Sequence, residues 1–169
     1  MSPRKWQTGS SAADRRANRH MRIALYEPEI AGNVGAVLRL GACLGAGVDL
    51  IEPLGFQWDD RRVRRAAMDY IDHVEITRHA DFEAFRQTLG SSRLVLFTTK
   101  ASQSLYDFAF RDDDVLLFGK ESAGVPAEVA DVCDAKIRIP IRAEVRSMNL
   151  ASAAALVLGE AQRQVGGFG

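Results

Sequence analysis

The sequence predicts an α/β protein with a mainly parallel sheet flanked by helices. From Met21 onward, short β-rich runs alternate with helical stretches. Several runs, such as RLVLFT and VLLF, are almost wholly apolar, which is typical of strands buried on both faces. Strands that alternate with helices form parallel sheets covered by those helices. The chain of 169 residues has no internal repeat or linker, so we expect a single domain over residues 21–169.

The individual elements follow from apolar runs and from capping residues. The expected strands are Arg22–Tyr26, Val48–Ile51, His73–Thr77, Arg93–Thr98, Val115–Phe118 and Lys136–Ile139. The expected helices are Val34–Leu44, Asp60–Asp69, Asp81–Leu89, Pro126–Val132 and Ser147–Val165. Asn33, the two aspartates that open their helices and Ser147 are the expected N-caps, because their side chains accept hydrogen bonds from free helical N–H groups.

Composition excludes several classes of protein. The 22 basic and 22 acidic residues balance, and 47% of residues are hydrophobic, which is ordinary globular composition. No apolar run approaches the roughly 18 residues of a membrane helix. Cys43 and Cys133 lie far apart and the three histidines are scattered, so neither a metal site nor a disulfide framework is indicated. We therefore expect a reduced, cytoplasmic protein that binds no membrane and no metal.

Residues 1–20 differ from the rest of the chain. They are polar and basic, and they lack the apolar centre of a secretory signal. A disordered leader or tag is one interpretation, and a basic arm that contacts RNA is the other.

Three unusual segments follow expected strands, where ligands of parallel sheets bind. The first is EPEIAGNVGAVLRL, in which Gly32 and Gly35 permit a tight turn or a close approach and Arg39 is charged in an apolar stretch. The second is LLFGKESAGVP, which is neither a dinucleotide fingerprint nor a P-loop. The third is IPIRAEVRSMNL, a loop with charged residues before the last helix. A surface arginine, a plain strand-to-helix connection and simple helix caps are the structural alternatives.

Taken together, these segments resemble the SPOUT superfamily of RNA methyltransferases. The matching text is LYEPEIAGNVGAVLRL, LFGKESAGVP and IRIPI followed by RSMNLASAAALV. IEPLGFQWDDRRVRRAAMDY is most similar to a small branch, the TrmL (YibK) family of tRNA wobble-position 2′-O-methyltransferases. Two positions depart from the pattern: Lys120 stands where relatives often carry Pro, and Gly159 where close relatives often carry an aromatic residue.

The resemblance implies a fold, a reaction and a set of site residues. It implies a deep trefoil knot at the carboxyl end, S-adenosylmethionine as cofactor, and methylation of the ribose 2′-hydroxyl of C or U at position 34, in the anticodon loop of leucine tRNAs. The implied cofactor positions are Phe97, Gly119, Ile139 and Ser147. Arg39 is the implied catalytic residue; since a guanidinium stays protonated, binding phosphate or stabilising the forming oxyanion is an alternative to acting as the base.

The remaining expectations concern partners. Asn33, Glu121 and Asn149 are expected substrate-binding residues by the resemblance, and Arg62 and Arg65 belong to a basic cluster that would reach RNA phosphate, unless it only pairs with nearby aspartates. We also expect a homodimer through small residues of the last helix, namely Ala151, Ala154, Ala155 and Gly159. A 2′-O-methyltransferase for another tRNA or rRNA site, and a non-catalytic RNA-binding module, remain alternatives.

Overall fold

A computed structural model describes residues 7–8 and 20–167, and its centre is one sheet in which every strand pairing is parallel. The strand order is β1-β4-β3-β2-β7-β5-β8-β6. The strands are β1 (Gln7–Thr8), β2 (Arg22–Tyr26), β3 (Gly47–Ile51), β4 (Ile76–His79), β5 (Leu94–Phe97), β6 (Gln103–Ser104), β7 (Val115–Phe118) and β8 (Ala135–Arg138). The predicted mainly parallel sheet is confirmed in this arrangement.

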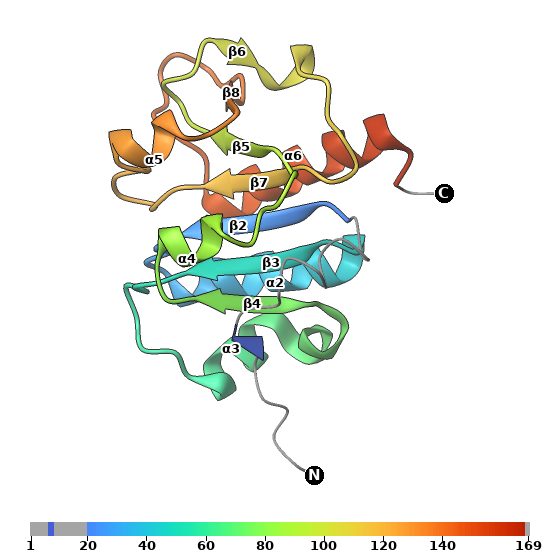
Figure 1. The fold of residues 1–169 in the computed structure, drawn as a ribbon. Helices are drawn as coiled ribbons and strands as arrows, with labels where there is room; N and C mark the ends of the chain where they lie inside the picture. Colours follow the sequence, from blue (N-terminus) through green and yellow to red (C-terminus); the bar gives the residue numbers. More distant parts are fainter. Residues whose placement is uncertain (1–6, 9–19, 168–169) are drawn as a thin grey trace.

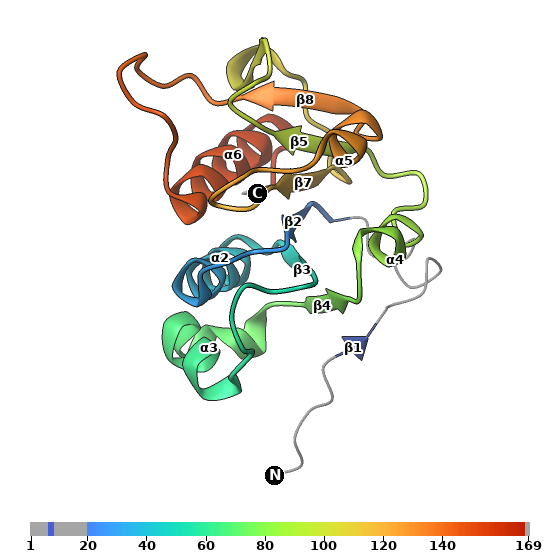
Figure 2. The same ribbon diagram turned by 90° about the vertical axis from the view of Figure 1, so that its left-hand side faces the viewer.

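Helices cover both faces of the sheet (Figures 1 and 2). One face carries α2 (Ala31–Leu44), α3 (Asp60–Ala67) and α6 (Leu150–Val165), and the other carries α4 (Phe82–Arg86) and α5 (Ala127–Asp131). Two 3-10 helices complete the elements of the described residues, η1 (Met68–His73) and η2 (Leu105–Asp107). The result is a three-layer α/β structure.

Alternate residues of the central strands contribute to two cores. Ile23 and Leu25 face α2 and α6, whereas Ala24 faces the side of α4 and α5, as the alternation of side chains along a strand requires. Both sides of these strands are mainly apolar, which explains why sequences such as VLLF read as continuous hydrophobic runs.

Several predicted boundaries need correction. β4 begins at Ile76, and His73 ends η1 instead of opening a strand. Asn33 lies inside the first turn of α2, whose N-cap is Ile30 without a side-chain hydrogen bond. Asp59 caps α3 one residue earlier than expected. Asp81 caps α4 as predicted.

The last helix also begins later than expected. Asn149, not Ser147, is the N-cap of α6, because its Oδ1 accepts from the N–H groups of Ala151 at 2.9 Å and Ser152 at 3.2 Å.

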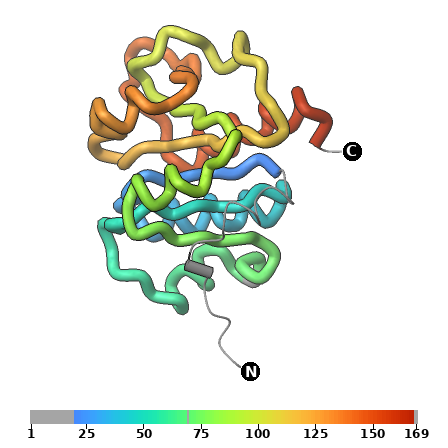
Figure 3. Tube along the Cα trace, viewed as in Figure 1, coloured from blue at the N-terminus to red at the C-terminus, as the bar shows by residue number. Residues whose placement is uncertain are grey.

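The chain changes direction across the sheet between β2 and β7. From β2 it builds β3 and β4 on one side, and it then fills the other side with β5, β7 and β8 (Figure 3). Such a reversal opens a crevice at the carboxyl ends of the strands, where ligands of parallel sheets bind. The connections that leave β2 and β7 therefore meet at the expected site.

The prediction for residues 1–20 lies largely outside the described residues. Gln7–Thr8 pairs with β4, and His20 is exposed.

Candidate active site

Three of the four predicted cofactor positions lie at the ends of neighbouring strands. Phe97 is the last residue of β5, Gly119 directly follows β7, and Ile139 directly follows β8. β5 pairs with both β7 and β8, with Phe97 opposite Phe118 and Ile137. These three positions are far apart in sequence, but they lie together at the carboxyl ends of adjacent strands.

The Phe97 side chain belongs to the core. Its ring stacks on Phe118 with 5.1 Å between centroids and on Phe110 at 6.4 Å, and only 8% of the residue is exposed. A ligand at this position would therefore meet mainly the backbone of Phe97.

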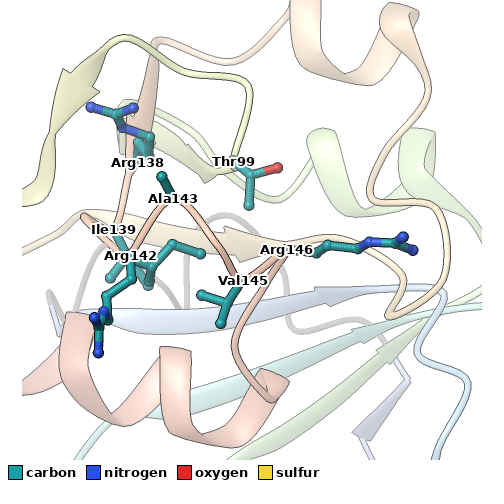
Figure 4. A pocket seen from close by; sticks show the side chains of 8 residues that line it. Thr99, Arg138, Ile139, Arg142, Ala143, Val145 and Arg146 are labelled. Carbon is teal, nitrogen blue, oxygen red and sulfur yellow. The ribbon is translucent and has the colours of Figure 1, made fainter.

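A hollow of about 220 Å³ opens beside β8 (Figure 4). Its lining is Thr99, Arg138, Ile139, Ile141, Arg142, Ala143, Val145 and Arg146. Ile139 is the one predicted cofactor position in this lining; Ser147 follows Arg146 directly in an exposed loop. Pockets for small molecules usually have about 300–1,000 Å³, so this hollow suits one part of a cofactor-sized molecule.

The loop after β7 is folded tightly on itself. The backbones of Lys120 and Gly124 exchange two hydrogen bonds of 2.9 Å, and Gly124 has φ +67°. A Cβ on Gly119 would lie 2.4 Å from the carbonyl carbon of Gly124, so a side chain at position 119 would force the backbone to shift. Glycine is required at position 119 by this close approach.

Three predicted substrate-binding residues form one hydrogen-bonded group, here called the polar chain: Glu121, Asn33 and Asn149. The Glu121 carboxylate accepts from the Asn33 side-chain amide at 3.3 Å, and Asn149 Nδ2 donates to Asn33 Oδ1 at 2.9 Å. Glu121 also accepts from the backbone N–H groups of Glu29 at 2.9 Å and Ile30 at 3.3 Å. The polar chain joins the loops after β2 and β7 to the start of α6.

The same two loops are held by further charged contacts that sequence reasoning missed. The Glu29 carboxylate accepts from Ser122 N–H at 2.9 Å and from its hydroxyl at 2.7 Å, and these bonds lower the pKa of Glu29. Lys120 Nζ lies 2.7 Å from Glu27 Oε2, and this hydrogen bond raises the pKa of Lys120. The sequence signal for these contacts was the pair Glu27 and Glu29 after β2, together with the Lys-Glu-Ser run that begins at Lys120 after β7.

Arg39 lies on the exposed side of α2, where its guanidinium sits 5.2 Å from the centre of the Tyr70 ring. Tyr70 is in η1 and is 38% exposed. Arg39 is therefore an accessible cation whose position depends in part on an aromatic neighbour. The polar chain meets the same helix closer to its start, because Asn33 lies in the first turn of α2.

Gly35 has a packing role rather than one in a turn. It is buried in α2, and a Cβ there would lie 2.2 Å from the Ala66 Cβ, so it lets α3 approach α2 closely.

The arginines of α3 face solvent, and acidic residues accompany them. Arg61, Arg62, Arg64 and Arg65 are exposed. Arg62 lies 3.7 Å from Asp59 and Arg64 lies 3.9 Å from Asp72. Exposed pairs of this kind stabilise weakly, by about 0–1 kcal/mol, so the arginines remain available to an anion.

The small-residue face of α6 is divided between core and surface. Ala154 is fully buried in the chain's own core and Ala151 packs against that core, whereas Ala155 and Leu156 are exposed. A Cβ on Gly159 would meet nothing within 4 Å. Ala154 is thus unavailable for the contact expected of it between subunits.

The described part of the chain lacks both a membrane span and a metal-binding cluster. None of its helices is long and apolar enough to cross a bilayer. It also contains no group of three or more His, Cys, Asp or Glu side chains placed to hold a metal ion.

The fold and the sequence together define a methyltransferase of the SpoU type. The sequence profile of the SpoU rRNA Methylase family matches residues 20–159, and the chain belongs to this family.

Its relatives in that family include tRNA-modifying enzymes. A tRNA (cytidine(34)-2′-O)-methyltransferase of Beijerinckia indica is 56% identical over 146 residues, which cover 85% of this chain and 91% of that protein. The protein of the same name in Escherichia coli K12 is 45% identical over 86% of this chain and 94% of its own length.

Solved structures agree with this assignment. One described as "Structural insights into the 2-OH methylation of C/U34 on tRNA" has a TM-score of 0.83 and 41% identity, over 86% of this chain and 96% of its own. An AdoMet-bound rRNA methyltransferase of Sinorhizobium meliloti has a TM-score of 0.83 and 28% identity, over 93% of this chain and 61% of its own.

Proposed function

We propose that this protein transfers a methyl group from S-adenosylmethionine to the ribose 2′-hydroxyl of C or U at position 34 in the anticodon loop of tRNA, with leucine tRNAs as substrates. The observation that carries the proposal is that a predicted cofactor position and the polar chain lie side by side: Gly119 and Glu121 belong to the same short loop after β7. The names of the tRNA-methylating relatives support the choice of substrate.

The residues present fit the cofactor. The hollow beside Ile139 has an aliphatic wall from Ile141 and Val145, which suits part of a nucleoside, and Gly119 lets the loop after β7 fold closely against Gly124. Phe97, Gly119, Ile139 and Ser147 would hold S-adenosylmethionine, largely through backbone groups. When bound, the cofactor would supply an electrophilic methyl group on a sulfonium sulfur; the 2′-oxygen would take this methyl, the sulfur would leave as a neutral thioether, and the hydroxyl proton would pass to solvent water.

The protein's own residues would position the acceptor nucleotide. Glu121, Asn33 and Asn149 orient one another, and together they would hold the nucleotide against the cofactor site, which supplies much of the rate in such displacements. Arg39 would act on the acceptor by stabilising the forming oxyanion or by binding an adjacent phosphate. Arg62 and Arg65 would contribute an outer contact with RNA phosphate.

The assembly and the chain path are further parts of the proposal. We propose a homodimer in which Ala155 and Gly159 of α6 contact the second copy, because both face outward and permit close helix packing. We also propose that the segment from β8 to α6 forms the trefoil knot of relatives. The path of the chain supports this proposal. β8 lies beyond β5 in the sheet, and the segment that follows it returns to place α6 against β7 and α2, nearer the middle of the sheet.

One assay tests the reaction and its position together. Purified protein is incubated with labelled S-adenosylmethionine and a leucine tRNA transcript, and nucleosides are analysed by mass spectrometry. We expect 2′-O-methylcytidine or 2′-O-methyluridine at position 34. The matched control is the same tRNA with a 2′-deoxynucleotide at position 34, which should accept no label. Methylation of that control, or no transfer to the leucine tRNA, would refute the proposed substrate.

A further inference from the structure

Three arginines surround the hollow and belong to one stretch of chain. Arg138 ends β8, and Arg142 and Arg146 lie in the loop that leads to α6. All three are exposed, and their guanidinium groups point away from one another on different sides of the hollow (Figure 4). We call them the rim arginines.

The charge around the rim arginines is unbalanced. Residues 138–149 contain three arginines and one acidic residue, Glu144. Arg142 lies 3.7 Å from Glu144, but both side chains are more than two-thirds exposed, at 87% and 75%, so water weakens this pair. An excess of positive charge therefore remains at the hollow.

The arginines of α3 are in a different electrostatic setting. Residues 59–72 contain four arginines and four aspartates, and Arg62 and Arg64 each lie within 4.0 Å of an aspartate. A polyanion approaching this helix meets no net charge, whereas one approaching the rim arginines meets an excess of about two charges.

The geometry of the reaction also favours the rim arginines over those of α3. The acceptor ribose of an RNA strand has a phosphate on each side, so an RNA whose 2′-oxygen reaches the cofactor must bring its phosphates to the border of that pocket. Guanidinium groups bind phosphate with two parallel hydrogen bonds, which makes arginine suited to this task.

We propose that the rim arginines are the main phosphate-binding surface for RNA in this protein, ahead of the arginines of α3. The inference rests on the proposed function, in that it takes RNA as the substrate and the hollow as part of the cofactor site.

Two matched double variants test this assignment. Arg142→Ala/Arg146→Ala removes two rim arginines, and Arg62→Ala/Arg65→Ala removes two exposed arginines from α3. Dissociation constants for a leucine tRNA transcript are measured by fluorescence anisotropy at several salt concentrations between about 50 and 200 mM. Each lost phosphate contact reduces the slope of log K against log salt by about one. Arg142→Ala/Arg146→Ala should thus reduce the slope by about two and weaken binding at least tenfold at the lowest salt concentration. The α3 variant should change the slope by less than one.

Two further measurements separate phosphate binding by the rim arginines from an effect on the cofactor site. Arg142→Lys/Arg146→Lys keeps the positive charge. Its slope of log K against log salt should therefore stay close to that of the wild type, whereas its affinity for tRNA should recover less, because lysine lacks the two parallel hydrogen bonds of a guanidinium. Because Arg142 and Arg146 line the hollow, the dissociation constant for S-adenosylmethionine is measured separately in Arg142→Ala/Arg146→Ala, by calorimetry without RNA, and the salt slope for tRNA is measured without cofactor. A weakened cofactor with an unchanged salt slope would overturn the inference, and so would a larger loss of slope in the α3 variant. The assay measures binding alone, so failure to methylate position 34 would count against the proposed function without touching this result.

Discussion

Asn149 Nδ2 donates a hydrogen bond of 2.9 Å to Asn33 Oδ1, which joins the start of α6 to the first turn of α2 across 116 positions of sequence. The direction of this bond is set by the helix itself. Asn149 uses its oxygen to cap α6, so its nitrogen must face Asn33, whose own nitrogen then faces Glu121. One helix cap thereby orients the whole polar chain.

The two roles of Asn149 can be separated by substitution. Asn149→Ala should cost about 1 kcal/mol of stability through the lost cap, and it should also slow methyl transfer. Asn149→Asp keeps a good capping oxygen and places a favourable negative charge at the helix start, but it loses the donor to Asn33. We therefore expect near-wild-type stability in urea and a kcat/KM lower by roughly three- to tenfold, about the value of one hydrogen bond.

The outcome for Asn149→Asp decides between the roles. Wild-type turnover in that variant, combined with a loss in Asn149→Ala that matches its lower stability, would make Asn149 a helix cap only. Ser152→Ala is a suitable control, since the same helical turn is changed without touching the polar chain.

The strands were predictable because burial on both faces produces continuous apolar runs in the sequence. Five of the six expected strands coincide with observed ones within a residue or two, for example Val115–Phe118. Where a helix starts was harder to predict, because Ser147 and Asn149 are both good caps and lie two residues apart. The tertiary bond from Asn149 to Asn33 favours the later start, and this contact is invisible in the local sequence.

Charged residues inside the sheet show a second limit of sequence reasoning. Arg22 Nε donates to Asp49 Oδ2 at 2.7 Å, and His79 Nε2 lies 2.7 Å from the other oxygen of Asp49. The three residues come from neighbouring strands, so they meet only because of the register between β2, β3 and β4. Hydrophobic patterns weakly specify register when strands are apolar on both faces, so this buried cluster could not be foreseen.

Arg39→Ala should abolish most methyl transfer while the fold and cofactor affinity survive. Arg39 is exposed, so its loss leaves no cavity, and removal of a charge that acts on the reacting oxygen costs about 10²–10³ in kcat. Single-turnover kinetics with saturating tRNA would measure this effect. Near-wild-type turnover would make Arg39 an ordinary surface residue.

Tyr70 offers a graded test of the same arrangement. Tyr70→Phe keeps the ring beneath the Arg39 guanidinium and should be almost neutral. Tyr70→Ala removes a contact worth about 0.5–1 kcal/mol at an exposed site, so kcat should fall by about two- to fivefold. If both variants lower kcat equally, the hydroxyl rather than the ring is responsible.

Two glycines should respond to alanine with opposite signs. At Gly119 the added Cβ meets Gly124 backbone at 2.4 Å, and relief of such a clash costs about 1–3 kcal/mol. At Gly159, inside α6, the Cβ has open space, so the higher helix propensity of alanine should stabilise by about 0.5–1 kcal/mol. Urea unfolding measures both changes, and calorimetry should show weaker cofactor binding for Gly119→Ala only. A destabilised Gly159→Ala, with a reduced dimer in light scattering, would instead indicate that the second copy fills this space.

The two cysteines should differ in their reaction with iodoacetamide. Burial raises the pKa of the Cys133 thiol to about 11, and its Sγ donates to the Val129 carbonyl at 3.2 Å, whereas Cys43 is exposed. The thiolate is the reactive form, and at about pH 8 a thiol with this pKa is ionised to about one part in a thousand. Below this pKa the thiolate fraction of Cys133 rises about tenfold with each pH unit, so its labelling should accelerate by the same factor between about pH 8 and 10. Peptide mass spectrometry should therefore find Cys43 modified first, and Cys43→Ser should leave only the slow reaction. Equal labelling of both cysteines at the lower pH in the folded protein would show that α5 opens readily and exposes Cys133.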